Sequence, residues 1–162
     1  MDKYYLKQNK MTTIRKARPE EWSIIADFQR KLALETENII LNPEVLQNGV
    51  QTVLKDSSKG CYFLAETDGR INGSLMITYE WSDWRNNMIY WIQSVYVLPE
   101  FRRRGIYRKL YEHVKNLALN TNGVGGIRLY VDNSNRPAQQ TYTNLGMNGE
   151  HYKVFEWMKP QE

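Results

Sequence analysis

The sequence predicts one α/β domain built around a mixed sheet. Its 162 residues are enough for a single core, and no repeat, low-complexity tract or linker divides them. Strand-like and helix-like segments alternate along the chain in the order βααβββαβαβ, as judged from the spacing of apolar residues. Consecutive strands mixed with helical connections are typical of a sheet that is covered by helices.

The first helices are predicted by proline and by helical spacing. After a short strand at residues 13–16, Pro19 and two acids open a helix over residues 19–36, in which Trp22, Ile25 and Phe28 recur at helical intervals. A second proline begins the helix expected over residues 43–55.

The remaining elements are marked by turns and apolar runs. Asp68-Gly69 is a strong hairpin signal between two strands, and Gly146 follows the last helix as a helix-ending glycine does. The later strands are expected over residues 61–66, 71–81, 88–97, 127–131 and 151–158. The later helices are expected over residues 105–119 and 136–145.

The composition excludes several kinds of protein. No stretch approaches the roughly 18 apolar residues of a membrane span, and residues 1–10 lack the apolar core of a signal peptide. Cys61 is the only cysteine and the two histidines are not paired in sequence, so we expect no disulfide and no metal site. We therefore expect a cytoplasmic protein without a membrane partner, with its domain over residues 13–162 and a flexible extension over residues 1–12.

The positive charge of the chain is concentrated in one segment. Residues 100–115 hold six basic and two acidic residues, and this excess accounts for the whole net charge of +4. A nucleic-acid-binding surface would spread its basic residues more widely. The pattern therefore favours a small polyanionic ligand and not a nucleic acid.

That basic segment joins a strand to a helix. An apolar strand ends at Pro99, three arginines follow at residues 102–104, and Gly105 precedes the next helix. The first amides of a helix have no intrahelical partner and lie at the positive end of its dipole, so they attract anions. The segment is therefore suited to a phosphate group.

Three motifs resemble those of the GNAT superfamily of N-acetyltransferases. The run Arg102-Arg-Arg-Gly-Ile-Tyr107 is similar to the acyl-CoA loop Q/R-x-x-G-x-G/A, although Tyr107 stands where the family usually has glycine or alanine. Val95-Tyr-Val-Leu-Pro99 resembles the strand before the loop. Asn135-Arg-Pro-Ala138 with Tyr142-Thr-Asn-Leu-Gly-Met147 resembles the N-x-x-A…Y-x-x-x-G-F/M helix.

The resemblance covers residues 13–158 and implies a particular fold and co-substrate. It implies a single-domain GNAT-like fold with a mixed, mostly antiparallel sheet, splayed central strands and about four helices. It also implies that acetyl-CoA is the co-substrate, with a strand backbone on its pantetheine and loop amides on its pyrophosphate. The residues implied to contact acetyl-CoA are Val95, Tyr96, Val97, Arg102, Arg103, Arg104, Gly105, Ile106, Tyr107, Asn135 and Tyr142. Asn135 could instead cap the last helix.

The resemblance also implies a catalytic acid, whereas the base is open. A tyrosine four residues before the helix-ending glycine often donates a proton to the departing thiolate in the family, and Tyr142 has this spacing. Many relatives carry a glutamate base on the strand before the loop, but residues 88–98 contain no acid. Glu80 is our predicted base. The alternatives are Asp83, Glu35, Glu37 and a chain of waters without a single base.

The acceptor is expected to be a small-molecule or peptide amine. Trp84 and Asp83, on the loop at residues 82–87, are the residues we expect to bind it. The resemblance also allows a homodimer. Two other functions compete with acetyl transfer: a non-catalytic acyl-CoA-binding module, suggested by the missing strand carboxylate, and a nucleic-acid binder that uses the arginine run.

Overall fold

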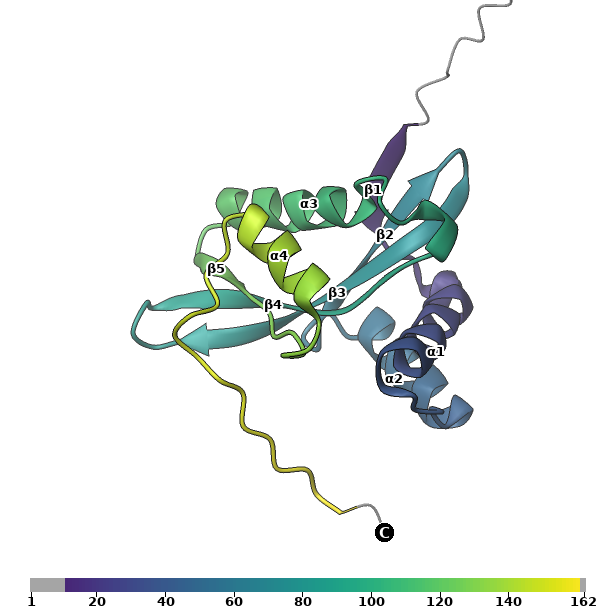
Figure 1. Ribbon diagram of the computed structural model, residues 1–162, viewed down its shortest axis with the longest axis horizontal. Coiled ribbons are helices and arrows are strands. Elements are labelled where there is room, and N and C mark those ends of the chain that lie inside the picture. The colour runs from purple at the N-terminus through teal and green to yellow at the C-terminus, as the bar shows by residue number, and fades with distance from the viewer. Residues whose placement is uncertain (1–10, 161–162) are drawn as a thin grey trace, which may run out of the picture. The chain divides into compact units, whose positions relative to one another are not determined.

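The computed structural model describes residues 11–160 (Figure 1). These residues form two compact units, and the boundary between the units lies between Arg128 and Leu129. The first unit contains β1 (Thr12–Lys16), α1 (Trp22–Glu37), α2 (Pro43–Lys55), β2 (Cys61–Thr67), β3 (Arg70–Ser82), β4 (Asn87–Val97), α3 (Ile106–Asn120) and β5 (Val124–Arg128). Short 3-10 turns at Pro19–Glu21 and Pro99–Phe101 precede α1 and α3. The second unit contains α4 (Arg136–Asn144).

The strands of the first unit form one sheet in the order β1-β2-β3-β4-β5. Neighbouring strands are antiparallel except β4 and β5, which are parallel. A parallel pair needs a crossover connection, and α3 supplies it. The predicted α/β class, with its mixed and mostly antiparallel sheet and four helices, is confirmed.

The helices of the first unit cover both faces of this sheet. The side chains of Tyr62 and Leu64 on β2 pack with Ile25 of α1 and Val50 of α2 in the buried core. Phe63 lies between them in sequence and places its ring centroid 4.8 Å from that of His113 on α3. Because side chains alternate along a strand, α1 and α2 cover one face and α3 covers the other, as Figure 1 shows.

The last two predicted strands differ from the structure. The fifth strand covers Val124–Arg128 and not residues 127–131. Gly125 and Gly126 lie inside this strand, where β4 is close: a Cβ on Gly125 would lie 3.0 Å from the Cβ of Asn87. The strand predicted over residues 151–158 is wrong, since no strand is assigned there. Alternating apolar residues suggested it, but a strand also needs a hydrogen-bonded neighbour.

The predicted extension over residues 1–12 lies outside the described residues, apart from its last two positions. Thr12 is already part of β1. Among the described residues, no helix combines the length and the apolar character needed to cross a membrane. The cytoplasmic location stays a prediction.

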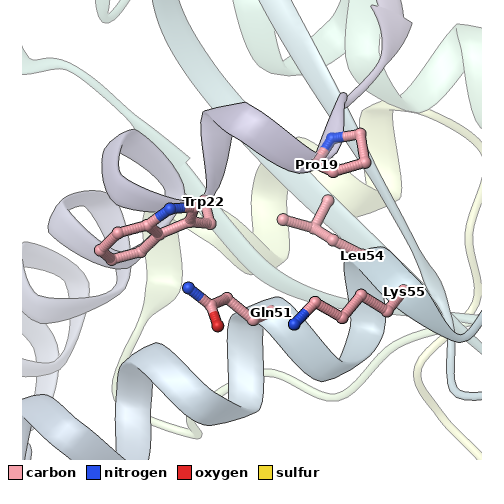
Figure 2. Close-up of a pocket in the computed structure, with 5 residues that line it drawn as sticks. All are labelled: Pro19, Trp22, Gln51, Leu54 and Lys55. Carbon is pink, nitrogen blue, oxygen red and sulfur yellow. The ribbon is translucent and has the colours of Figure 1, made fainter.

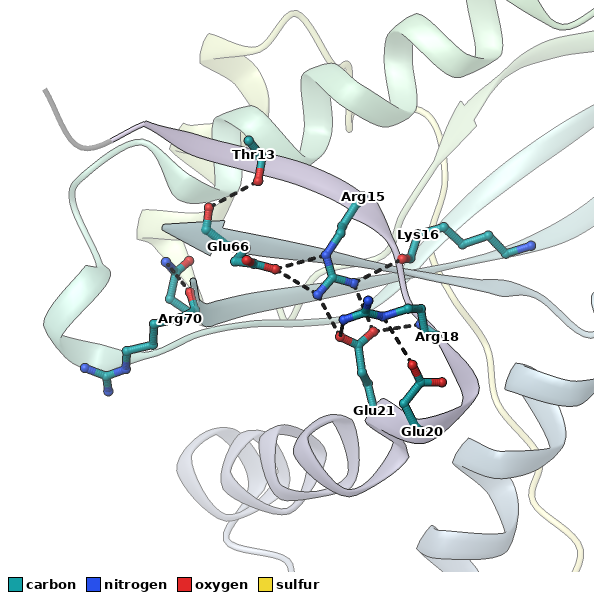
Figure 3. A network of polar contacts seen from close by, with 9 residues as sticks. Thr13, Arg15, Lys16, Arg18, Glu20, Glu21, Glu66 and Arg70 are labelled. Carbon is teal, nitrogen blue, oxygen red and sulfur yellow. Dashed lines mark hydrogen bonds and ion pairs between the residues drawn. The ribbon is translucent and has the colours of Figure 1, made fainter. Parts of the chain in front are cut away.

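A polar network fixes the start of α1 against the sheet (Figure 3). Arg15 on β1 donates two hydrogen bonds to Glu21, at 2.7 and 3.0 Å, and two to Glu66 on β2, at 2.8 and 3.0 Å. Glu21 is buried and also accepts from the backbone N–H of Arg18 at 2.7 Å. The hydrogen bonds from Arg15 and Arg18 lower the pKa of Glu21 to about 2.

Replacing Arg15 with methionine is expected to lower the free energy of unfolding by about 2 kcal/mol at pH 7, because the buried Glu21 would lose its main hydrogen-bond partner. The pKa of Glu21 is about 2 in the folded chain against 4.5 ordinarily, so its contribution is complete above the ordinary value and is lost as the pH falls towards 2. Urea unfolding between pH 2 and 7 should show this loss in the wild type and a flatter profile in R15M.

The control for this prediction is Arg30→Met. Arg30 pairs with Asp27 on the surface, where 55% and 38% of the two side chains are exposed. Exposed pairs contribute about 0–1 kcal/mol, so R30M should stay close to the wild type at every pH. Equal stabilities of R15M and wild type at pH 7 would contradict the account of the network.

Candidate functional site

A β-bulge interrupts β4 where the sequence placed the cofactor strand. Ser74 of β3 is opposite Tyr96, whereas Met76 is opposite Gln93, so Ser94 and Val95 together face one residue of β3. Ser94 has a φ of 52°, which an L-residue adopts at a cost. Its carbonyl accepts a hydrogen bond from the buried side chain of Gln29 on α1, at 3.3 Å. Helix α1 therefore supports the bulge directly.

Beyond the bulge, alternate backbone groups of β4 face away from β3. The N–H of Leu98 donates to the carbonyl of Asn72 at 2.9 Å, so Leu98 points at β3. Because backbone groups alternate in direction along an extended strand, the N–H and C=O of Val97, and those of Val95 before it, point to the other side. In the first unit, β5 pairs only with residues from Met88 to Trp91, so its last residue, Arg128, lies opposite Trp91.

This geometry splays the two parallel strands apart. The backbone of Val95 and Val97 has no strand partner in β5, and a ligand with amide groups could pair with it as an added strand would. The splayed central strands implied by the resemblance are thus present. Gly73 of β3 lies opposite Val97, and a Cβ there would come within 3.2 Å of the Tyr96 carbonyl and of Ile106 on α3, so the packing is tight at this point.

The loop after β4 presents an uncapped helix start. Arg103 and Gly105 have φ values of 60° and 76°, so two of four consecutive residues adopt the left-handed region. Gly105 is the N-cap of α3, and no side chain caps the helix there. Such a turn with free helix amides is an anion-binding concavity. Tyr107, the departure from the family motif, places its ring 6.4 Å from that of Tyr111, one turn further along α3.

The three loop arginines point in different directions. Arg104 lies over the ring of Phe101 at 5.3 Å, and the side chain of Arg103 is exposed. Arg102 turns towards α1 and β4: its Nε donates to the carbonyl of Val97 at 2.9 Å, and its guanidinium lies 5.4 Å from the centroid of Tyr96. The side chain of Arg102 therefore sits against the splayed strand.

Glu35 connects α1 to both the strand and the loop. Its carboxylate accepts from the hydroxyl of Tyr96 at 2.8 Å and from Nη2 of Arg102 at 2.6 Å. Burial alone would raise the pKa of Glu35, but the hydrogen bonds from Arg102 and Tyr96 outweigh it and hold that pKa below its usual value. Burial, and then the bond to Glu35, raise the pKa of Tyr96 to about 12. Tyr96 is therefore a neutral donor to an ionised Glu35.

Glu80, the predicted base, lies further along the hairpin. It is opposite Ile89, six residues before Val95, which is about 20 Å of extended strand. Its carboxylate accepts from Trp91 Nε1 at 2.6 Å and pairs with Arg128. The structure thus does not bring Glu80 to the bulge; of the carboxylates considered, Glu35 is the one that contacts the end of β4.

The predicted acceptor residues lie at the tip of the same hairpin. Asp83 accepts from the backbone N–H of Trp84 at 2.8 Å, and the side chain of Trp84 is 90% exposed. The hairpin closes at Ser82 and Asn87, so this tip is eight residues of β3 beyond Ser74 and the bulge. Trp84 and Asp83 therefore remain candidates only for a distal part of the acceptor.

The second unit carries the remaining motif on α4. Asn135 is the N-cap of α4 and accepts from the N–H of Ala138 at 3.1 Å, which is the capping role we considered. Gly146 has a φ of 84°, and the amides of Gly146 and Met147 donate to the carbonyls of Thr143 and Tyr142, so the helix ends as predicted. Tyr142 lies in the last turns of α4, and its role as an acid stays a prediction.

A small cavity lies elsewhere, between the start of α1 and the end of α2 (Figure 2). It measures about 90 Å³ and is lined by Pro19, Trp22, Gln51, Leu54 and Lys55. Ligand sites usually measure about 300–1,000 Å³, so this cavity is a packing gap and not a substrate site. Among the described residues, no three acids, histidines or cysteines gather as metal ligands would.

Two supporting residues escaped the sequence analysis. Gln29 was not singled out, although a polar residue on the apolar face of a helix beside Phe28 is a usable signal. Nothing else in the sequence indicates that Gln29 contacts Ser94. Serine has no special preference for positive φ, so the sequence does not indicate a bulge at this position. Glu35 was considered only as a base, and its contacts with Tyr96 and Arg102 depend on the tertiary fold.

Comparison with known proteins agrees with this geometry. A family model described as the acetyltransferase (GNAT) family matches residues 19–147. A possible acetyltransferase from Clostridium difficile 630 is 39% identical, with a TM-score of 0.86 over 94% of this chain and 100% of that chain. A predicted acetyltransferase from Clostridium acetobutylicum, solved with acetyl-CoA, is 20% identical, with a TM-score of 0.69 over 93% of this chain and 96% of that chain, and shares the fold.

Among curated proteins, the thialysine N-epsilon-acetyltransferase of Mus musculus is 34% identical over 83 residues, which are 48% of this chain and 48% of the mouse protein. The chain thus spans about half the length of the curated relatives it matches. The fold and the splayed strand define an acetyltransferase-type domain. This chain belongs to the GNAT acetyltransferase family.

Proposed function

We propose that this protein transfers an acetyl group from acetyl-CoA to a primary amine by direct attack while both substrates are bound. The observation that supports this most strongly is the bulge at Ser94, because it exposes the backbone of Val95 and Val97 on the side away from β3. A site for a thioester and its amide-containing arm needs strand groups that no neighbouring strand occupies. The arginine-rich turn and uncapped α3 follow directly along the chain.

The residues present fit acetyl-CoA at both ends of this path. The backbone groups of Val95 and Val97 would hold the pantetheine arm, while the loop from Arg102 to Tyr107 would hold the pyrophosphate with its amides and positive charge. When bound, acetyl-CoA supplies an acetyl thioester whose carbonyl carbon an amine can attack. The N–H of Val95 would stabilise the negative charge that develops on the carbonyl oxygen.

Proton transfers at the amine and at the leaving thiolate complete the reaction. An alkylamine has a pKa of about 10, so it must lose a proton before its lone pair can attack. Glu80 remains our proposed base; its distance from the bulge requires intervening waters. Once the C–N bond forms and the C–S bond breaks, the Tyr142 phenol would give its proton to the leaving thiolate. The second proton lost by the amine nitrogen as it becomes an amide would pass through solvent and return Tyr142 to its neutral form. Positioning both substrates would supply much of the rate.

The acceptor we propose is a small alkylamine with a lysine-like ε-amino group. Met76, Thr78 and Glu80 alternate onto the face of β3 that α1 and α2 cover, and Glu35 contacts Tyr96 on that same face. Each carboxylate is paired with an arginine, Glu80 with Arg128 and Glu35 with Arg102, so an alkylammonium group would compete with these arginines for them. The mouse relative, which is named for an N-epsilon-acetyltransferase activity, suggests the same class of acceptor.

Release of free thiol from acetyl-CoA in the presence of amines tests this proposal. The panel would contain thialysine, lysine, a diamine, an aminoglycoside and a lysine peptide, with mass spectrometry of each product. We expect amine-dependent thiol release with the small alkylamines and an N-acetyl product. Saturable binding of acetyl-CoA without transfer to any of these amines would instead indicate the non-catalytic acyl-CoA-binding module.

A further inference from the structure

Arg102 forms a hydrogen bond with a backbone carbonyl that the proposed co-substrate would also use. Its Nε–H donates to the carbonyl of Val97 at 2.9 Å, and this carbonyl lies on the side of β4 that faces away from β3. A pantetheine amide that pairs with Val97 would require the same carbonyl. Both donors would approach this carbonyl on the side of β4 away from β3, so binding of the acetyl-CoA arm favours departure of Arg102 from Val97.

Glu35 is the residue that holds Arg102 in this place. The carboxylate of Glu35 accepts from Nη2 of Arg102 at 2.6 Å, and the ring of Tyr96 lies under the guanidinium at 5.4 Å. Tyr96 is 3% exposed and packs its ring against Phe28 of α1 at 5.4 Å, so the platform under Arg102 is fixed. The hydroxyl of Tyr96 in turn donates to Glu35 at 2.8 Å, which orients the carboxylate.

The charges make the arrangement responsive to an anion. Arg102 and Glu35 are 44% and 39% exposed, so their ion pair is reachable by solvent and of modest strength. Arg102 is also the first residue of the loop expected to bind the pyrophosphate. A guanidinium that loses Glu35 can therefore gain a phosphate oxygen, to which it forms charge-assisted and often bidentate hydrogen bonds.

We infer that Glu35 is a positioning residue that competes with acetyl-CoA for Arg102, so that binding of the co-substrate transfers this arginine from Glu35 and the Val97 carbonyl to the pyrophosphate. The inference rests on the proposed use of acetyl-CoA. By this inference Glu35 lowers the affinity for acetyl-CoA, so removing its charge should raise that affinity. Removing a residue with a purely structural role would lower the affinity instead.

Replacing Glu35 with glutamine tests this inference. The amide oxygen of glutamine can still accept from Tyr96, so the platform is kept while the negative charge that holds Arg102 is lost. Exposed ion pairs contribute up to about 1 kcal/mol, so E35Q should bind acetyl-CoA about three- to fivefold more tightly than the wild type in calorimetric titration. A structural defect would weaken binding instead.

Two controls separate this effect from a general change in charge. Glu100 lies beside the same loop and pairs with Arg70 at 2.5 Å, so E100Q removes an equal charge without touching Arg102. E100Q should tighten binding clearly less than E35Q does. In an R102A background, the further change E35Q should have no effect, because the arginine that it releases is absent.

A second measurement observes the contact without any ligand. In an NMR spectrum of the wild type, the Nε–H of Arg102, assigned by its loss in R102K, should be protected from exchange by its bond to Val97, and E35Q should speed its exchange. Any one of three results would overturn the inference. These are unchanged exchange of the Arg102 Nε–H in E35Q, unchanged or weaker acetyl-CoA binding by E35Q, and tighter binding by E35Q that persists in the R102A background. No acetyl-CoA binding by the wild type would overturn the proposed function and this inference together.

Discussion

Replacing Tyr142 with phenylalanine is expected to lower turnover about a hundredfold while the affinity for acetyl-CoA changes less than about twofold. A positioned proton donor typically contributes a factor of about 10²–10⁴, and a phenol can protonate a leaving thiolate that would otherwise depart as an anion. The change removes one oxygen and leaves the helix cap at Gly146 intact. Steady-state rates at saturating amine and calorimetric titration with acetyl-CoA measure the two quantities.

Tyr79→Phe is the matched control for this experiment. Tyr79 lies on β3 with its ring 5.7 Å from that of Tyr90, and it belongs to neither the loop nor the bulge. Its loss of a hydroxyl should leave turnover unchanged. An unchanged rate in Y142F would remove Tyr142 from the mechanism, whereas weaker acetyl-CoA binding with an unchanged rate at saturation would assign it to cofactor binding instead.

Deleting Ser94 should abolish acetyl-CoA binding, with a loss in affinity of at least about a hundredfold. The deletion removes the extra residue of the bulge, so the register between β3 and β4 would become continuous. Val95 alone would then lie opposite Leu75, while Tyr96 and Val97 would keep Ser74 and Gly73 as their partners. What β4 would lose is the bend that the bulge imposes, so its end would no longer splay away from β5, and calorimetric titration would show no binding.

Two substitutions keep this prediction testable if the deletion variant does not fold. Ser94→Gly retains the residue count and favours the φ of 52°, so binding should stay within about twofold of the wild type. Ser94→Val places a β-branched residue in the left-handed region at a cost of about 1–2 kcal/mol, so it should lower both thermal stability and acetyl-CoA affinity. Equal affinities in S94V and S94G would contradict a role for the bulge geometry.

Helical spacing and turn residues predicted most of the fold. All four predicted helices are present in the described residues. Pro19, Pro43 and Gly146 mark helix ends that depend on local chemistry alone, so these ends could be predicted from the sequence. The hairpin at Asp68-Gly69 is likewise local, and both residues adopt positive φ there. The strand predicted over residues 151–158 was wrong because alternation reports only the faces of a segment, and pairing depends on distant residues.

The candidate site was predictable in outline and not in detail. The arginine run and Gly105 can be read directly from the sequence, and the uncapped start of α3 follows from them. The bulge at Ser94 is not visible, because the residue that takes positive φ is neither glycine nor asparagine. The direction of Arg102 was also hidden, since its partner Glu35 is 67 residues away in sequence.

The central claim is that this domain binds acetyl-CoA along the splayed edge of β4, and calorimetric titration tests it most directly. The purified protein would be titrated with acetyl-CoA and, separately, with free adenosine nucleotides. We predict saturable binding of acetyl-CoA that is clearly tighter than that of the nucleotides, because the strand backbone adds contacts that the loop alone cannot make. Absence of acetyl-CoA binding, or equal affinity for the nucleotides, would contradict the account.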